Sequence, residues 1–411
     1  MLLVSVDDLR PGMRLGRGIW TADNQLLLGP GVILKEEFIR QIVVRGYTSV
    51  WIEDEDTKDV PYQEDLSEAT RLAAVSSMIE VFKVVSPITH ALRQESLSEV
   101  KKSLRSERLC EVIGTHPAIQ QLIESIERIV EEILQLDVLS GLQSIRTHDT
   151  YTYHHCLDMA VGAMMIGKRL YFSREQMRNL ATGCVLHDIG KIFVDDAILN
   201  KPGMLDPEEF KRMKDHTVLG YLLLKDTLRI GILPAHIAYQ HHERQDGTGY
   251  PRGLRGTNAI RSRRDRYASG RITLMGEIAA IADFYDACCS DRPYRKGFPP
   301  DRVWQMIRER AGTHFNREIA EVFLSSLPVY PVGISVVVTE GPYRGYRGVV
   351  VHVSPTALGQ PVVRLTTDPK GKRVEPFEID LRKDEAQVRG IVREGAEEPR
   401  DWMTVIESKT S

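Results

Sequence analysis

Residues 185–191 read Val-Leu-His-Asp-Ile-Gly-Lys, and a second pair of histidines, His241 and His242, follows later in the chain. Together with His187 and Asp188, these residues supply both imidazole and carboxylate groups. That ligand mix is typical of catalytic transition-metal sites, and the chain has no Cys-x-x-Cys motif that would indicate a thiolate site. The pattern indicates a metal-dependent hydrolase.

The composition is that of a soluble enzyme. At 411 residues the chain is expected to hold two or three domains, and with 42% hydrophobic residues it can bury a large core. No apolar run reaches the roughly 18 residues that span a bilayer. Asp7 and Asp8 interrupt the apolar N-terminus before the core of a signal peptide could form. We therefore expect a cytoplasmic protein that binds no membrane.

The cysteines and charges exclude further classes. The five cysteines lack the spacing of a disulfide framework, which favours a reducing compartment; they stand at 110, 156, 184, 288 and 289. The net charge of −3 comes from interspersed charges of both signs, so nothing indicates a nucleic-acid polymer as partner.

Sequence patterns in the first part of the chain predict a small domain followed by a connecting segment. Short β-type stretches with Gly-Pro turns, followed by an apolar helical spacing, predict a small α+β domain over 1–55. Residues 56–145 begin with an acidic linker and continue as a helical connector. The connector carries an apolar stripe that would either pack on the next domain or form the seam of a homodimer; its members are Ile123, Ile126, Ile129, Val130, Ile133 and Leu134.

Helix signals place the first ligand candidates within a predominantly helical region, 146–328. Ser173 and Gln176 form a capping box, and the helix that they begin delivers His187 and Asp188 at its C-terminal end.

Two further helices carry the other histidines. One is expected to begin at Asp206-Pro207, and its apolar face directs His216 inward. The next is expected to open at Pro234 and to end at the His241-His242 pair, before a glycine-rich loop.

Eight of the twelve histidines fall between 148 and 242. A single histidine is usually structural, but a group at helix ends and inner faces indicates a metal site. His155 is a good further ligand, and Asp283 lies in an apolar stretch where a carboxylate needs a cation or a hydrogen-bonding partner. His148 and His154 are expected to be structural or surface residues.

Strand signals dominate from residue 331 onward. The stretches 334–340, 347–354, 361–367 and 375–381 predict a small β-barrel over 331–390 that serves interaction or regulation. A loose tail, 391–411, follows it.

Several motifs now follow one another as they do in a known family. In chain order they are His187-Asp188 with Gly190-Lys191, Lys201-Pro202-Gly203, His216 with Gly220, His241-His242-Glu243, Gly249-Tyr250-Pro251, Asp283-x-x-Asp286-Ala287 and Asp291-Arg292-Pro293-Tyr294-Arg295. They cover 146–328 and resemble the HD-GYP family. The resemblance implies an all-helical phosphodiesterase that converts cyclic di-GMP to pGpG and, in some members, on to GMP.

The resemblance also implies the roles of individual residues. One metal would be held by His155, His187, Asp188 and Asp283, and a second by Asp188, His216, His241 and His242, with Asp188 as the bridge. Two metals suit this reaction, because together they lower the pKa of water and stabilise the attacking and leaving oxygens. Lys191 would act with Asp188 in catalysis by holding a phosphoryl oxygen or stabilising the leaving oxygen. Asp286 would orient a metal-binding residue next to the bound substrate.

The metal count and the substrate contacts depend on other positions. Some members hold a third metal with a Glu where this chain has Tyr151, so we expect two ions, iron or manganese, with zinc compatible. Arg292 and Arg295 match phosphate-contacting positions, although a solvated helix end is an alternative. Tyr250 would shape the pocket, and its loop could bind a protein partner.

Alternatives stay open on three points. The expanded basic loop 255–271 is either a lid that gathers the anionic substrate or a surface loop. The site could belong to a non-catalytic cyclic di-GMP receptor, or to an HD-superfamily hydrolase of another nucleotide. The terminal domains could bind signalling partners, but the sequence does not identify the regulatory input.

Overall fold

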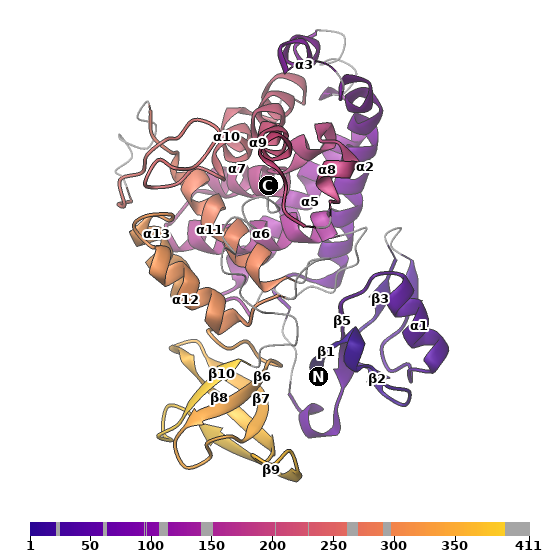
Figure 1. The fold of residues 1–411 in the computed structure, drawn as a ribbon, viewed down its shortest axis with the longest axis vertical. Helices are drawn as coiled ribbons and strands as arrows, with labels where there is room; N and C mark the ends of the chain where they lie inside the picture. Colours follow the sequence, from indigo (N-terminus) through magenta and orange to yellow (C-terminus); the bar gives the residue numbers. More distant parts are fainter. Residues whose placement is uncertain are drawn as a thin grey trace.

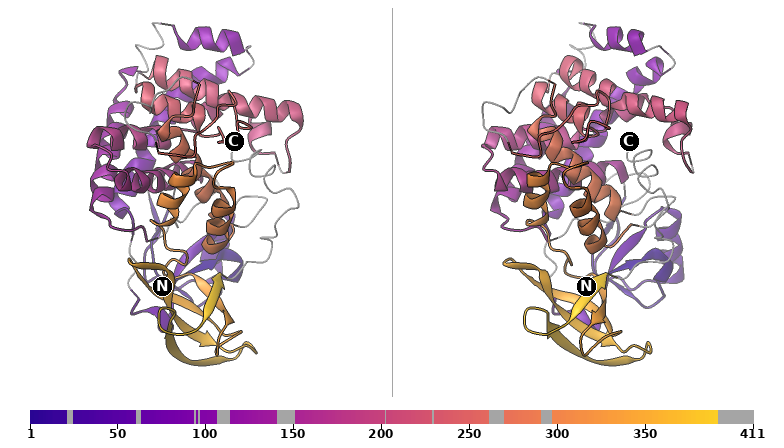
Figure 2. Two further views of the ribbon diagram at one scale, coloured as in Figure 1. Left: turned by 90° about the vertical axis from the view of Figure 1, so that its left-hand side faces the viewer. Right: turned by 60° about the vertical axis from the view of Figure 1, so that its left-hand side comes forward.

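The structure, a computed structural model, describes residues 1–390 except 22–24, 61–63, 94, 96, 107–113, 141–150, 202, 229, 261–269 and 291–296. A helical body carries an N-terminal and a C-terminal part that contain the sheets, and both parts lie at the same end of it (Figures 1 and 2). None of the helices within the described ranges is long and apolar enough to cross a membrane.

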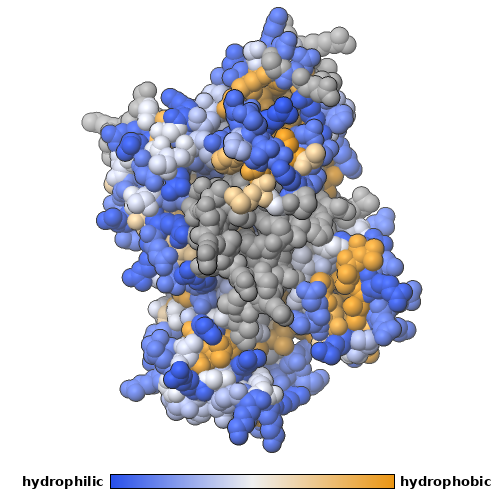
Figure 3. Space-filling model, in the orientation of Figure 1, coloured by the Kyte–Doolittle hydropathy of each residue, from blue (hydrophilic) through white to orange (hydrophobic). Residues whose placement is uncertain are grey.

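The N-terminal part has the α+β character expected from sequence. It contains β1 (Leu2–Ser5), β2 (Arg14–Leu15), β3 (Ile19–Trp20), β4 (Leu26–Leu28), α1 (Glu36–Val44) and β5 (Ser49–Glu53). The strands pair in the orders β1-β5-β2 and β3-β4 around a separate apolar core. Four large apolar side chains of this part stay exposed, and Figure 3 shows an apolar patch over it; they are Leu26, Ile33, Val43 and Val44.

The helical body supplies most of the chain. Its helices are α2 (Glu68–Leu92), α3 (Leu97–Leu104), α5 (Pro117–Gln135), α6 (Tyr151–Arg169), α7 (Arg174–Val185), α8 (Asp196–Leu199), α9 (Pro207–Leu222), α10 (Ile232–Gln240), α11 (Leu274–Cys289), α12 (Pro300–Arg310) and α13 (Arg317–Leu324). Short helical segments η3 (Ile189–Phe193) and η4 (Leu223–Thr227) follow α7 and α9. The apolar stripe of α5 packs into this core, with Ile126, Ile129 and Ile133 fully buried.

The capping signals of two helices are confirmed. Ser173 and Gln176 form the capping box of α7, and Asp206 forms one with Glu209 at α9. The expected start of α10 at Pro234 is wrong by two residues. Gly231, at φ +124°, allows the helix to start at Ile232, and the proline occupies the first turn, where its missing N–H is not required.

The C-terminal strands lie close to their expected positions. They are β6 (Ser335–Glu340), β7 (Arg347–Ser354), β8 (Ala357–Thr367), β9 (Arg373–Asp380) and β10 (Gln387–Gly390), paired antiparallel in the order β10-β6-β7-β8-β9. In the part of the chain described, β10 and β9 form the two edges of this sheet. A small sheet domain is therefore present, and closure into a barrel stays a prediction.

Helix α11 runs through the centre of the body and is buried at every position from Leu274 to Cys288. Three acidic residues on it are thus removed from water, and each needs a compensating partner. Glu277 accepts hydrogen bonds from Gln245 and Asn316. The other two, Asp283 and Asp286, lie beside the predicted metal ligands.

A close approach between η3 and α9 brings two parts of the predicted site together. A Cβ atom at Gly190 would lie 1.9 Å from the His216 carbonyl oxygen and 2.6 Å from the Gly220 nitrogen. Only glycine allows the backbone segment after Asp188 to pack against α9 at this distance.

We expect Gly190→Ala to lower the free energy of unfolding by about 1–3 kcal/mol, because the added methyl group forces the two backbones apart. Urea unfolding of the full chain measures this loss. The matched control is Gly359→Ala, whose new Cβ would meet only Val329 Cγ2 at 3.7 Å. Equal unfolding midpoints for the two variants would contradict the packing argument.

Candidate metal centre

Seven predicted ligands come from five helical elements and meet inside the helical body. They are His155 on α6, His187 and Asp188 directly after α7, His216 on α9, His241 and His242 directly after α10, and Asp283 on α11. Two groups of three residues each bring their ligand atoms within 4.8 Å of one another: His155 with His187 and Asp283, and His216 with His241 and His242. These groups hold six of the seven candidates, and Asp188 lies beside both of them.

Asp188 faces both groups. Its Oδ2 lies 3.2 Å from His187 Nε2, and its Oδ1 lies 3.7 Å from His216 Nε2 and 3.9 Å from His241 Nε2. One carboxylate thus presents one oxygen to each group, as a bridging ligand does.

Backbone carbonyls hold three of the rings in a common orientation. The Nδ1 atoms of His187, His216 and His241 lie 2.8, 2.7 and 3.0 Å from the carbonyl oxygens of Cys184, Met213 and Ala238. With Nδ1–H donating outward, the Nε2 atoms of all three rings point to the centre, where a metal would take the place of a proton.

His155 is oriented by a carboxylate instead. Its Nδ1 lies 2.6 Å from Asp286 Oδ2, while its Nε2 lies 3.1 Å from Asp283 Oδ1. Asp286 is fully buried behind the ring. This position suits an orienting role, which raises the basicity of the imidazole, and not a direct contact with substrate.

The electrostatics of the site favour a bound cation. Burial lowers the pKa of His216 to about 4 and that of His241 to about 3, so both rings are neutral ligands at pH 7. Burial alone would raise the pKa of Asp188, but His187 and Lys191 outweigh it and hold that pKa well below the ordinary value. The carboxylate is therefore ionised.

Buried atoms without partners support the same conclusion. His242 Nε2 and Asp188 Oδ1 are buried and have no hydrogen-bond partner among the described residues. Such atoms are costly unless a cation satisfies them, and an imidazole–carboxylate set suits a divalent transition metal. The residues present therefore fit a divalent metal centre.

Lys191 lies directly beside the centre. Its Nζ is 2.7 Å from Asp188 Oδ2, and its side chain is largely buried. Tyr250 stacks on His242, with ring centroids 4.7 Å apart. Arg292 and Arg295 lie outside the described residues, as do 261–269 of the basic loop.

The sequence analysis gave no role to two nearby residues. Cys156 forms a further group with His187 and Asp188, and its buried thiol follows His155 in the chain. Glu243 is also buried, and it accepts hydrogen bonds from the Arg252 and Leu254 backbone amides. It thereby anchors the end of the Gly-Tyr-Pro loop; an acid directly after two ligands was the available signal.

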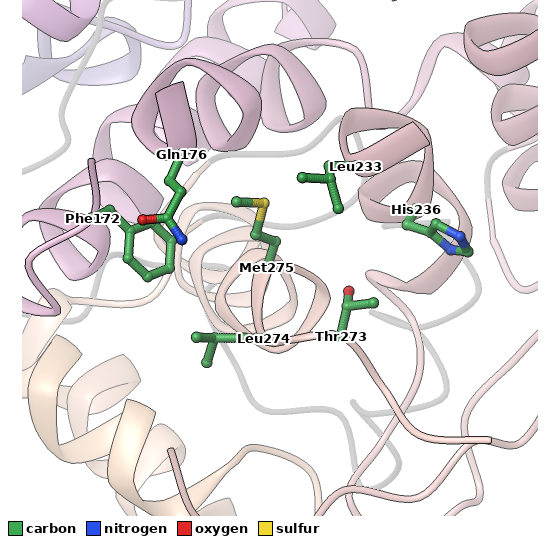
Figure 4. A pocket seen from close by; sticks show the side chains of 7 residues that line it. All are labelled: Phe172, Gln176, Leu233, His236, Thr273, Leu274 and Met275. Atoms are coloured by element: carbon green, nitrogen blue, oxygen red, sulfur yellow. The ribbon is translucent and has the colours of Figure 1, made fainter. Parts of the chain in front are cut away.

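A separate hollow contains none of the predicted site residues. It lies between α7, α10 and the start of α11 (Figure 4). Its lining is mostly apolar and consists of Phe172, Gln176, Leu233, His236, Thr273, Leu274 and Met275.

Comparisons with known proteins agree with this geometry. The HD domain family matches residues 128–319. The cyclic di-GMP phosphodiesterase PA4108 of Pseudomonas aeruginosa is 30% identical over 389 residues, which cover 92% of this chain and 87% of that protein.

Two shorter matches lie within the same family. A cyclic di-GMP phosphodiesterase of Thermotoga maritima is 33% identical over 58% of this chain and 60% of its own length. The 3'3'-cGAMP-specific phosphodiesterase 3 of Vibrio cholerae is 34% identical over 44% of this chain and 36% of its own length. From the near full-length match and the buried His-Asp centre, we conclude that the chain belongs to the HD-GYP family of HD-domain phosphodiesterases.

Proposed function

We propose that the protein hydrolyses cyclic di-GMP to pGpG with two divalent metal ions held by the seven ligands. The observation that carries the proposal is the position of Asp188, with one oxygen toward each of two histidine groups. One metal would be bound by His155, His187, Asp188 and Asp283, and the other by Asp188, His216, His241 and His242. When bound, such ions act as Lewis acids and lower the pKa of water.

The protein's own groups supply positioning and charge. Asp188 fixes the separation of the two groups, and the Lys191 ammonium beside it would hold a phosphoryl oxygen or stabilise the leaving oxygen. Asp286 keeps His155 oriented. The phosphodiester is anionic, so Arg292 and Arg295 are proposed as further phosphate contacts.

Iron or manganese suits the ligand set best, and zinc is compatible with it. Two ions are proposed because Tyr151 replaces the Glu of members that hold a third metal. Only the backbone of Tyr151, at the start of α6, is described.

Tyr250 has a second role in this proposal. Backbone carbonyls orient the rings of His187, His216 and His241. The ring of His242 instead stacks on the tyrosine ring, at an interplanar angle of 25°. Lys214 lies over the same ring, 5.5 Å from its centroid. We infer that the ring holds His242 in place while it shapes the substrate pocket.

The relatives favour one alternative substrate. Because some of them are named as 3'3'-cGAMP-specific, this dinucleotide is the second candidate. A non-catalytic receptor is the third reading. The expected domain division, 1–55, 56–145, 146–328 and 331–390, is retained as a proposal, with the terminal domains, the Gly-Tyr-Pro loop or a second copy as partner surfaces.

We expect the full chain, loaded with Mn²⁺ or Fe²⁺, to convert cyclic di-GMP to pGpG, as measured by chromatography of the products. The double variant His187→Ala, Asp188→Ala should form no product, because both metal groups lose a ligand. Binding without hydrolysis would favour the receptor, and faster turnover of 3'3'-cGAMP would change the assigned substrate.

Metal analysis of anaerobically purified protein should give two ions per chain. His242→Ala is expected to lower this number, whereas His154→Ala, next to a ligand but outside the two groups, should leave it unchanged. Three ions per chain in the wild-type protein would contradict the dinuclear proposal.

Replacing Tyr250 separates its two proposed roles. Tyr250→Ala should lower metal affinity, and with it metal content, and should lower kcat by about tenfold, because orienting partners of metal ligands contribute effects of this order. Tyr250→Phe keeps the stacked ring and should retain the wild-type metal content. If both variants bind metal normally, the ring does not position His242.

A further inference from the structure

Helix α2 packs against η3, the segment that follows the proposed bridging ligand Asp188. Arg93, the cap residue directly after this helix, donates from Nε to the Ile192 carbonyl oxygen over 3.0 Å. The same guanidinium binds both carboxylate oxygens of Asp196, at 3.0 and 3.3 Å. Ile192 belongs to η3 and follows Lys191 directly, and η3 begins directly after Asp188.

The segment that Arg93 holds is short and needs external support. Segment η3 has only five residues, and the hydrogen-bond geometry of a 3-10 helix is poorer than that of an α-helix. Yet Lys191 must keep its Nζ at 2.7 Å from Asp188 Oδ2. A planar guanidinium that binds a carbonyl and a carboxylate at once supplies a fixed outer contact for this turn.

A second arginine on α2 binds the helix that carries His155. Arg71 Nη1 lies 2.8 Å from Asp158 Oδ1, and Asp158 is fully buried on α6, three residues after His155. Helix α2 and its cap residue therefore contact both the segment that follows the proposed bridging carboxylate and a helix with a histidine ligand.

We propose that Arg93 is a positioning residue for the phosphodiesterase reaction and acts through η3 on Lys191. This inference rests on the proposed role of Lys191. Arg93 is better suited to a test than Arg71, because loss of Arg71 would leave the buried charge of Asp158 uncompensated. Asp196 is 66% exposed, so its pair with Arg93 contributes little to stability.

The test compares kcat and KM of the metal-loaded full chain with cyclic di-GMP. Arg93→Ala should lower kcat about tenfold, as loss of an outer contact to a catalytic segment does, and leave KM unchanged. Arg93→Lys keeps one donor for the Ile192 carbonyl and should restore part of the rate. The control is Lys83→Ala, which removes an exposed ion pair with Glu80 from the same helix and should keep the wild-type kcat.

A double-mutant cycle distinguishes positioning from general damage. If Arg93 acts through Lys191, Arg93→Ala should cause no further loss of rate in a Lys191→Ala background. Equal losses in both backgrounds would overturn the proposal.

Hydrogen exchange provides a readout that is independent of substrate. Arg93→Ala should speed amide exchange in 188–196 and leave 232–243 unchanged. Should the wild-type protein fail to hydrolyse cyclic di-GMP, the proposed function fails while this readout still tests the positioning. Unchanged exchange in 188–196 would overturn the positioning itself.

Discussion

The structure depends on keeping an ionised carboxylate, Asp188, buried among imidazoles. Removing a carboxylate from water costs several kcal/mol, so the surroundings must compensate it. The Lys191 ammonium at 2.7 Å and the neighbouring histidines do so, and a divalent metal bound by these residues would add to their effect. The glycine at 190 and the buried helix α11 serve the same end, because they bring the elements that carry these groups close together.

Local signals made much of the fold predictable from the sequence. The capping boxes of α7 and α9 depend on residues three apart, and the strands of the C-terminal sheet on alternation and turns. The early start of α10 was missed because Gly231 adopts a positive φ that a proline signal does not reveal. The predicted closure of the C-terminal strands into a barrel stays a prediction, because it depends on pairing between distant strands and not on local signals.

The sequence predicted the metal ligands of the candidate site but not the contacts that surround them. All seven metal-binding candidates are brought together as the family motifs imply, and Asp283 was also indicated by its apolar surroundings. The stacking of Tyr250 on His242 and the reach of Arg93 to η3 could not be predicted. Both depend on side-chain directions and on contacts between elements far apart in the sequence.

The C-terminal sheet also contacts the segment that follows β5 through charged groups. Arg364 on β8 binds both carboxylate oxygens of Asp59, at 2.6 and 2.8 Å, and Arg373 binds Asp56 in the same region. The Arg364–Asp59 pair joins residues separated by 305 positions. An exposed ion pair contributes too little free energy to close a chain segment of that length by itself, so this contact depends on the folded helices that bring its partners together. We therefore expect this contact to be lost when the helical body between its two partners unfolds.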